Sequence, residues 1–435
     1  MGKTRRGWWA LGLMGALAAM TITAHAVGEA PTGAATPGGE HVADENAGLK
    51  AIVQAMQVAD APALLKLYQE SADPIVHVWS AMALERVHFN LDGASAAAQA
   101  CEQALLDTHP GLALSCGQFR IGNLQLAGRA AEARQAEQAL IEHYRGHRVD
   151  RRLDAMQAYL DNRAAQPPLS YEVPAGDVSL PTKQDAAIPT VKAKANGHEF
   201  ELMLDTGASD MILGEDAARR YGVKPLDRNG KVSGWLSKGV PTQAGVLDTL
   251  ELGGIILHNV PVTVVPKPIA LIGSNLVAPL GTLRISSQSV LVYGRDSTVP
   301  ACDTPMLAGS GLWDDQLRLF PRLLVNDQPQ SVMLDSGAYR YLIGTRTALD
   351  EVTALHRRKT AMRDVGGTHA FANAESAKVN LTIAGQPFDI LFEVYTDATN
   401  IKYPITLGAG ALRDMDFLLD FRHQRQCFLL HPNLR

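Results

Sequence analysis

Apolar and polar residues alternate with two different periods, and the change of period divides the chain into two parts. From about residue 45 to 163, apolar residues recur at spacings of three and four, as in AAQACEQALL, which is the period of an amphipathic helix. Beyond two consecutive prolines at 167 and 168, short alternating runs of Val, Ile, Leu and Thr are separated by Gly, Asn and Pro. Such runs are typical of β-strands. We therefore expect a multidomain protein, with an all-α domain followed by an all-β region.

The helical part contains an internal repeat. Eight residues between Leu91 and Leu105 recur 35 positions later, between Leu126 and Leu140. A period near 34 residues, with small residues on paired helices, resembles a tetratricopeptide-type (TPR-like) array, whose stacked helices form a surface for a protein partner. An ordinary bundle of Ala-rich helices is the alternative. Both readings predict a helical repeat-like domain over residues 45–163.

The first 26 residues have the pattern of a secretory leader. Three basic residues precede an uncharged, mostly apolar run that ends near Met20, and small residues stand at 24 and 26. This arrangement predicts a signal peptide over residues 1–26, cut after Ala26. A flexible linker rich in Gly, Ala and Pro follows over residues 27–44. We expect a periplasmic or secreted protein; an uncleaved anchor is the alternative.

Charge and cysteine content narrow the function classes. The formal net charge of the 435-residue chain is −5, which favours neither nucleic acid nor an anionic membrane as a partner. No segment after the leader is long and apolar enough to predict stable membrane insertion. The four cysteines do not have zinc-site spacing, and we expect no metal and no cofactor. Export permits disulfides, and pairs within domains are favoured over free buried thiols: Cys101 with Cys116, and Cys302 with Cys427.

Two short motifs in the β-rich part stand in matching apolar frames. Leu204-Asp205-Thr206-Gly207-Ala208 is followed 130 residues later by Leu334-Asp335-Ser336-Gly337-Ala338. The first motif ends a predicted hairpin with an Asn-Gly turn, and each motif precedes an apolar run closed by Gly. A surface turn alone would explain one Asp-Thr-Gly sequence. It does not explain two copies in the same frame, so we expect a duplicated unit.

The residue types in these motifs suit paired-carboxylate chemistry. Asp205 and Asp335, brought close together, cannot both ionise easily and would share one proton. One carboxyl group could then activate a water while the other polarises a carbonyl group. The hydroxyls of Thr206 and Ser336 would hydrogen-bond across the two loops. Gly207 and Gly337 would permit sharp turns and close approach of the backbone.

On these motifs the chain resembles the aspartic peptidases of the pepsin–retropepsin clan, and in particular bacterial retropepsin-like enzymes. Ala follows Gly in both copies, and ALIGSNL at 270–276 is similar to the retropepsin stretch before the last helical turn. The corresponding ITLGAGA at 405–411 lacks the Asn-Leu pair. The resemblance implies a bilobal acid-protease fold, a double β-barrel with lobes at 175–297 and 306–435. Because both motifs lie in one chain, it also implies an active site formed within a monomer.

The duplication also predicts two flaps. In the family, a glycine-rich hairpin between the Asp loop and the late Gly of each half folds over substrate and excludes water. The matching positions are Gly234 and Trp235 in the first half, and Gly366 and Gly367 in the second. We expect Trp235 to pack on bound peptide and His369 to neighbour the cleft. Ordinary hairpin tips are the alternative.

These observations predict an exported aspartic endopeptidase that acts on peptide or protein substrates. The alternative is a non-catalytic peptide-binding or assembly protein on the same scaffold, with the helical domain binding a partner. The intact Asp205 and Asp335 favour the enzyme, because a scaffold that had lost its activity is expected to lose a carboxylate of the pair first.

Overall fold

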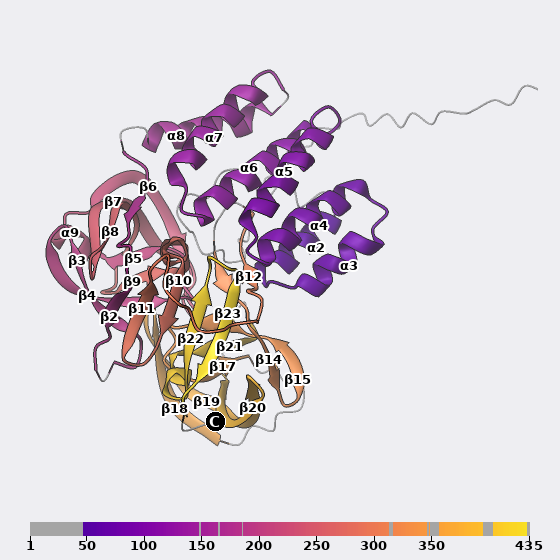
Figure 1. Cartoon of the computed structure of the whole chain (residues 1–435). Coiled ribbons are helices and arrows are strands. Elements are labelled where there is room, and N and C mark those ends of the chain that lie inside the picture. The colour runs from indigo at the N-terminus through magenta and orange to yellow at the C-terminus, as the bar shows by residue number, and fades with distance from the viewer. Residues whose placement is uncertain are drawn as a thin grey trace, which may run out of the picture.

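The computed structural model describes residues 47–147, 149–163, 166–184, 186–312, 316–345, 348, 356–394 and 403–432. The signal peptide and linker predicted over residues 1–44 lie outside this part. Figure 1 shows the helices gathered at one end of the molecule, above two β-rich lobes. Within the described ranges, no helix is long and apolar enough to span a membrane. The predicted order, a helical domain followed by two β-rich lobes, is confirmed.

The helical domain consists of antiparallel helices joined by short loops. Asp60, Asp73 and Asn90 cap successive helices, because each side chain accepts a backbone N–H of the first turn. Ala98 and its repeat equivalent Ala133 are fully buried, which lets neighbouring helices approach closely. The TPR-like classification stays a prediction. The helices are α2 (Ala47–Gln57), α3 (Ala61–Glu70), α4 (Pro74–Val87), α5 (Leu91–Leu105), α6 (Pro110–Leu126), α7 (Ala130–Tyr144) and α8 (Asp150–Arg163).

Lobe 1 is built on a sheet with strand order β1-β8-β5-β9-β4-β3-β7-β6. The predicted hairpin is confirmed: β3 pairs with β4, and Asn196 and Gly197 have the positive φ values of 48° and 82° that a type I′ turn requires. The elements are β1 (Ser170–Glu172), β3 (Thr190–Ala195), β4 (His198–Asp205), β5 (Met211–Gly214), α9 (Glu215–Arg220), β6 (Lys224–Val232), β7 (Val240–Leu252), β8 (Ile255–Val265), β9 (Ala270–Gly273), α10 (Ser274–Val277) and η1 (Ala278–Leu280).

Lobe 2 repeats the central part of this arrangement. Its sheet runs β12-β13-β16-β21-β17-β20-β19-β14-β15, and β18 pairs with β19 beside this path. The elements are β12 (Ala308–Gly309), β13 (Arg318–Leu319), β14 (Arg322–Val325), β15 (Gln328–Ser331), β16 (Met333–Asp335), β17 (Leu342–Gly344), β18 (His356–Asp364), β19 (Gly367–Ile383), β20 (Gln386–Val394), β21 (Ile405–Gly408) and η3 (Ala409–Arg413).

A third sheet joins the two lobes. Its order is β2-β11-β10-β22-β23, and the lobe 1 strand β10 pairs antiparallel with the lobe 2 strand β22. The strands are β2 (Val178–Pro181), β10 (Thr282–Ile285), β11 (Ser289–Tyr293), β22 (Met415–Asp420) and β23 (Arg425–Leu430). The Cys302–Cys427 disulfide ties β23 to the segment between the lobes.

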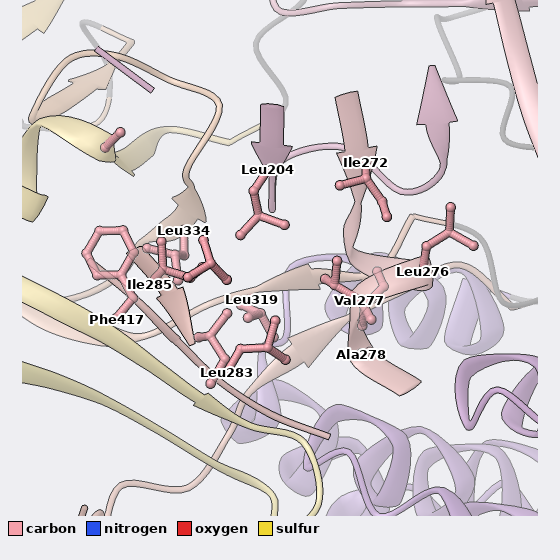
Figure 2. Close-up of a cluster of buried hydrophobic side chains, with 14 of the residues drawn as sticks. Leu204, Ile272, Leu276, Val277, Ala278, Leu283, Ile285, Leu319, Leu334 and Phe417 are labelled. Carbon is pink, nitrogen blue, oxygen red and sulfur yellow. The ribbon is translucent and has the colours of Figure 1, made fainter. Parts of the chain in front are cut away.

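The core of the β-rich part lies between this joining sheet and the two motif strands. Figure 2 shows Leu204 and Leu334, the residues before the two motif aspartates, in one cluster with Leu283, Ile285 and Phe417 of the joining sheet. All five side chains are buried. The two aspartates therefore stand on one shared core, and burial of that core fixes the lobes relative to each other.

The core of the helical domain extends into lobe 2. Leu307, Phe320 and Met333 belong to the same buried cluster as the inner residues of the helices. Met333 lies two residues before Asp335, at the start of β16. The Cys101–Cys116 disulfide links α5 to α6 inside the domain. The helical domain thus packs directly behind one of the two motif strands.

Candidate active site

The same local structure places each motif aspartate. β4 runs parallel to β9 with Asp205 beside Gly273, and β16 runs parallel to β21 with Asp335 beside Gly408. A Cβ added to Gly273 would lie 2.4 Å from the Ser209 carbonyl carbon, and one added to Gly408 would lie 2.2 Å from a backbone oxygen. Only glycine leaves room for each aspartate loop to pass this close to the neighbouring strand.

Four buried hydrogen bonds join the two loops reciprocally. The Thr206 hydroxyl donates to the Leu334 carbonyl oxygen at 3.0 Å, and the Ser336 hydroxyl donates to the Leu204 carbonyl oxygen at 2.7 Å. Each hydroxyl oxygen also accepts the backbone N–H of the other residue, at 2.9 and 3.0 Å. This is the exchange across the loops that the sequence predicts. It holds both aspartates in a rigid frame.

Each carboxyl group lies against the glycine of the opposite loop, so the two groups face each other closely enough to interact. A Cβ added to Gly207 would lie 2.4 Å from the Asp335 Cγ, and one added to Gly337 would lie 2.4 Å from the Asp205 Cγ. Each glycine also donates its backbone N–H to its own aspartate, at 2.9 Å in both loops. We call Asp205 and Asp335 the dyad.

Burial and proximity perturb the titration of the dyad. Burial raises the pKa of Asp205 well above its ordinary value, and the charge of Asp335 raises it further. Burial also raises the pKa of Asp335, although a hydrogen bond from Asp205 and the positive charge of Arg318 oppose the shift. The proton is therefore held by the pair, and the titration belongs to both groups together. A carboxyl pair with one proton can act as general base and general acid at once.

The dyad lies in a cavity of about 590 Å³ with walls from both lobes. This volume is in the usual range for ligand pockets. Apolar side chains of lobe 1 and lobe 2 face each other across it, among them Ile212, Leu271, Ile343 and Met362. The cavity can therefore hold a few apolar side chains of an extended ligand next to the dyad.

Two hairpin tips cover this cavity. The tip of lobe 1 is formed by residues 233–239 between β6 and β7, and that of lobe 2 by Val365 and Gly366 between β18 and β19. Gly234 and Trp235 line the cavity, as do Asp364 and Val365. Trp235 packs against the lobe 2 residues Ile343 and Met362. Gly366 and Gly367 are not among the lining residues; a Cβ on Gly366 would instead meet the Ser237 side chain.

One carboxylate ties the two tips together. Asp364 of lobe 2 accepts the backbone N–H groups of Leu236 and Ser237, both at 2.8 Å, and the Ser237 hydroxyl at 2.5 Å. It also accepts the Gly366 N–H at 2.9 Å and lies 3.0 Å from the His369 Nε2. Burial alone would raise the pKa of Asp364, but these hydrogen bonds outweigh it and lower the pKa. Sequence reasoning missed this contact, because no motif connects position 364 with position 237.

Comparisons with known proteins found one matching family model and several similar solved structures. A family model described as aspartyl protease matches residues 191–276, which contain Asp205 and lobe 1 up to Leu276. The chain is similar to a retropepsin-like aspartic protease from Rickettsia conorii, with 20% identity over 30% of this chain and 96% of that chain, at a TM-score of 0.22. It is also similar to an aspartic proteinase from Irpex lacteus, with 12% identity over 59% of this chain and 98% of that chain, at a TM-score of 0.38. None of the curated proteins matches significantly.

The family match confirms the resemblance to aspartic peptidases that the motifs indicate. The matched residues lie in lobe 1. Lobe 2 resembles the family through the repeated local structure around Asp335. The general class of activity that goes with this resemblance is peptidase activity. The two disulfides suit an oxidising compartment outside the cytoplasm.

Proposed function

We propose that this protein is an exported aspartic endopeptidase that hydrolyses peptide bonds with a water activated by Asp205 and Asp335. The single observation that carries the proposal is the pair of carboxyl groups that face each other in a cavity formed by both lobes. Residues 1–26 support export by their leader pattern. The disulfides are consistent with it.

The reaction follows from the shared proton. The ionised carboxyl group takes a proton from a water molecule between the two groups, while the protonated one donates to the oxygen of the scissile carbonyl. Water adds to the carbonyl carbon and gives a neutral tetrahedral diol. The diol then collapses: one carboxyl group of the dyad donates its proton to the nitrogen, a diol hydroxyl returns a proton to the other carboxylate, and the C–N bond breaks. The products are a free amine and a carboxylic acid, and the dyad again holds one proton. This route requires neither a covalent intermediate nor a cofactor.

The surroundings of the dyad support an extended peptide as substrate. The cavity is mainly apolar at its walls and is covered by the two hairpin tips, which would have to separate to admit a chain. Both carboxyl groups come from one polypeptide, so a monomer can contain the complete site. For the helical domain, binding of a protein partner through its stacked helices remains part of the proposal.

The test is cleavage of a peptide library by the chain starting at residue 27, beside Asp205→Asn and Asp335→Asn variants, over a range of pH. Asparagine keeps the size of the side chain but cannot share the proton. We expect each substitution to lower kcat/KM by at least about 10²-fold, the lower range for a general acid–base group. Asp327→Asn is a matched control, because Asp327 is exposed in a turn of lobe 2 with a φ of 61° that Asn tolerates.

Two outcomes would contradict the proposal. Equal cleavage by the wild type and both Asn variants would exclude the dyad mechanism. Tight peptide binding by the wild type without hydrolysis at any pH would instead favour the peptide-binding alternative. Thermal unfolding of every variant shows whether a loss of cleavage is a loss of fold.

A further inference from the structure

A buried arginine lies beside the dyad. Arg318 in β13 lines the same cavity as both carboxyl groups and is only 8% exposed. Its neighbour Leu319 pairs with Leu334 of β16, the strand that ends in Asp335. A charge this deeply buried is unfavourable unless an opposite charge or several hydrogen bonds compensate it.

Neutral groups compensate this charge only in part. The Arg318 Nη1 donates to the Ser209 Oγ and to the Leu317 carbonyl oxygen, both at 2.8 Å. Its Nε is buried and makes no hydrogen bond in the part of the chain that the structure describes. Ser209 belongs to the loop of Asp205, so the guanidinium group reaches from the strand next to Asp335 to the loop of Asp205. Its side chain contacts the loop of Asp205, while its own strand pairs with the strand of Asp335.

Arg340, Arg363 and Asp364, which also line the cavity, have partners other than the dyad. Arg340 lies 3.0 Å from Glu393, the Arg363 Nη2 donates to the Pro268 carbonyl oxygen, and Asp364 is bound to the hairpin tips. Asp210, which lies near Asn275, and Lys238 complete the charged lining. Arg318 is distinguished by its action on the dyad, because its positive charge lowers the pKa of both carboxyl groups.

The helical domain holds the segment that leads to Arg318. Arg86 of α4 is 1% exposed, and its Nη1 donates to the carbonyl oxygens of Gly311 and Leu312, both at 2.9 Å. Its other donors bind the Phe119 carbonyl oxygen at 2.5 Å and the Asn123 Oδ1 at 2.7 Å, within the helices. Arg86 therefore fixes this segment of lobe 2 to the helical domain shortly before β13.

We propose that Arg318 is a positioning residue whose fixed positive charge stabilises the anionic dyad, and that the helical domain maintains this arrangement through Arg86. The inference rests on the proposed function and adds a role for the helical domain inside the catalytic unit. Without the positive charge of Arg318, the dyad keeps its protons to higher pH. Both limbs of the pH profile of kcat/KM then move to higher pH.

The test compares the wild type with Arg318→Gln and Arg318→Lys on one cleaved peptide across the pH range. On the acidic limb of the wild-type profile, we expect Arg318→Gln to lower kcat/KM by roughly tenfold, as the loss of a nearby opposite charge implies. Near the maximum of its own profile, the variant keeps most of its activity. Arg318→Lys keeps the charge and restores most of the acidic limb. Arg318→Met keeps the aliphatic stem and gives the same readout if Arg318→Gln does not fold.

Arg86→Met tests the helical part of the inference. We expect a shift of the profile in the same direction as for Arg318→Gln, and smaller, because the segment loses its anchor but keeps its charge. A uniform loss of activity at every pH in the Arg318 variants would overturn the proposal, since it would show a packing role only. An unshifted profile in a folded Arg86→Met would overturn the role of the helical domain. Neither result would affect the proposed function, which fails if the dyad variants cleave like the wild type or if the wild type binds peptide without hydrolysing it at any pH.

Discussion

The two lobes are alike where they meet and different where they meet the rest of the molecule. Around the dyad, each lobe has an aspartate beside a late glycine and a hydroxyl that bonds across to the other loop. Away from it, lobe 1 has a long hairpin tip and lobe 2 a short one. Both lobes contact the helical domain, but Phe320 and Met333 of lobe 2 belong to the buried core of the helices. The family pattern is recognised over residues 191–276, in lobe 1. The two lobes therefore share the local geometry that places the dyad and differ in the elements around it.

The strongest test of the symmetry between the two lobes is to substitute one dyad aspartate and then both. If the dyad acts as a unit, Asp205→Asn and Asp335→Asn each lower kcat/KM by at least about 10²-fold, and the double variant loses little more. Steady-state cleavage of one peptide measures all three. Independent contributions would instead multiply to a loss of about 10⁴-fold, and that result would contradict a shared proton.

The crossed hydroxyls allow a second, smaller test. Thr206→Val and Ser336→Ala each remove two buried hydrogen bonds and leave a backbone N–H without an acceptor. Each should lower the free energy of unfolding by about 1–3 kcal/mol. Urea unfolding monitored by circular dichroism measures the free energy of unfolding of each variant. If the two loops are equivalent, the two losses agree within about 1 kcal/mol; a large loss in one lobe alone would show that only that hydroxyl holds the site.

The hairpin tips should give the smallest effect. Asp364→Asn and Ser237→Ala weaken the contact that closes the cavity, and we expect KM to change by about fivefold with kcat less affected, as for the loss of about 1 kcal/mol of hydrogen bonding. Because the pKa of Asp364 is lowered in the folded protein, its stabilising effect is present above the ordinary Asp pKa and is lost as the pH falls through the lowered value. The difference in thermal midpoint between the wild type and Asp364→Asn should therefore vanish in strong acid. A difference independent of pH would contradict an ionic contact.

Local signals in the sequence predict much of this molecule. The periods of apolar residues separate the helical domain from the β-rich lobes, and the Asn196-Gly197 turn fixes one hairpin. The matching frames of the two motifs predict that Asp205 and Asp335 meet, because a duplicated fold brings equivalent loops together. The two cysteine pairs follow from the preference for bonds within domains, and the structure contains both.

The remaining contacts could not be read from the sequence. Arg318 and Ser209 are 109 positions apart, and Ser237 and Asp364 are 127 apart. Arg86 bonds to carbonyl oxygens more than 200 positions away. Each contact joins elements of different domains or lobes without a repeated spacing, and a backbone acceptor has no residue type to recognise. Such contacts depend on how the folded domains pack against one another.

The sheet shared by the lobes has a consequence for the timing of activity. Since β22 and β23 follow both aspartates in the sequence and β22 pairs with β10 of lobe 1, the cleft is complete only after these two strands have been synthesised. An emerging chain that already carries both aspartates still lacks the strands that set its halves face to face. The order of synthesis therefore delays the proposed hydrolysis until these two strands have joined the sheet.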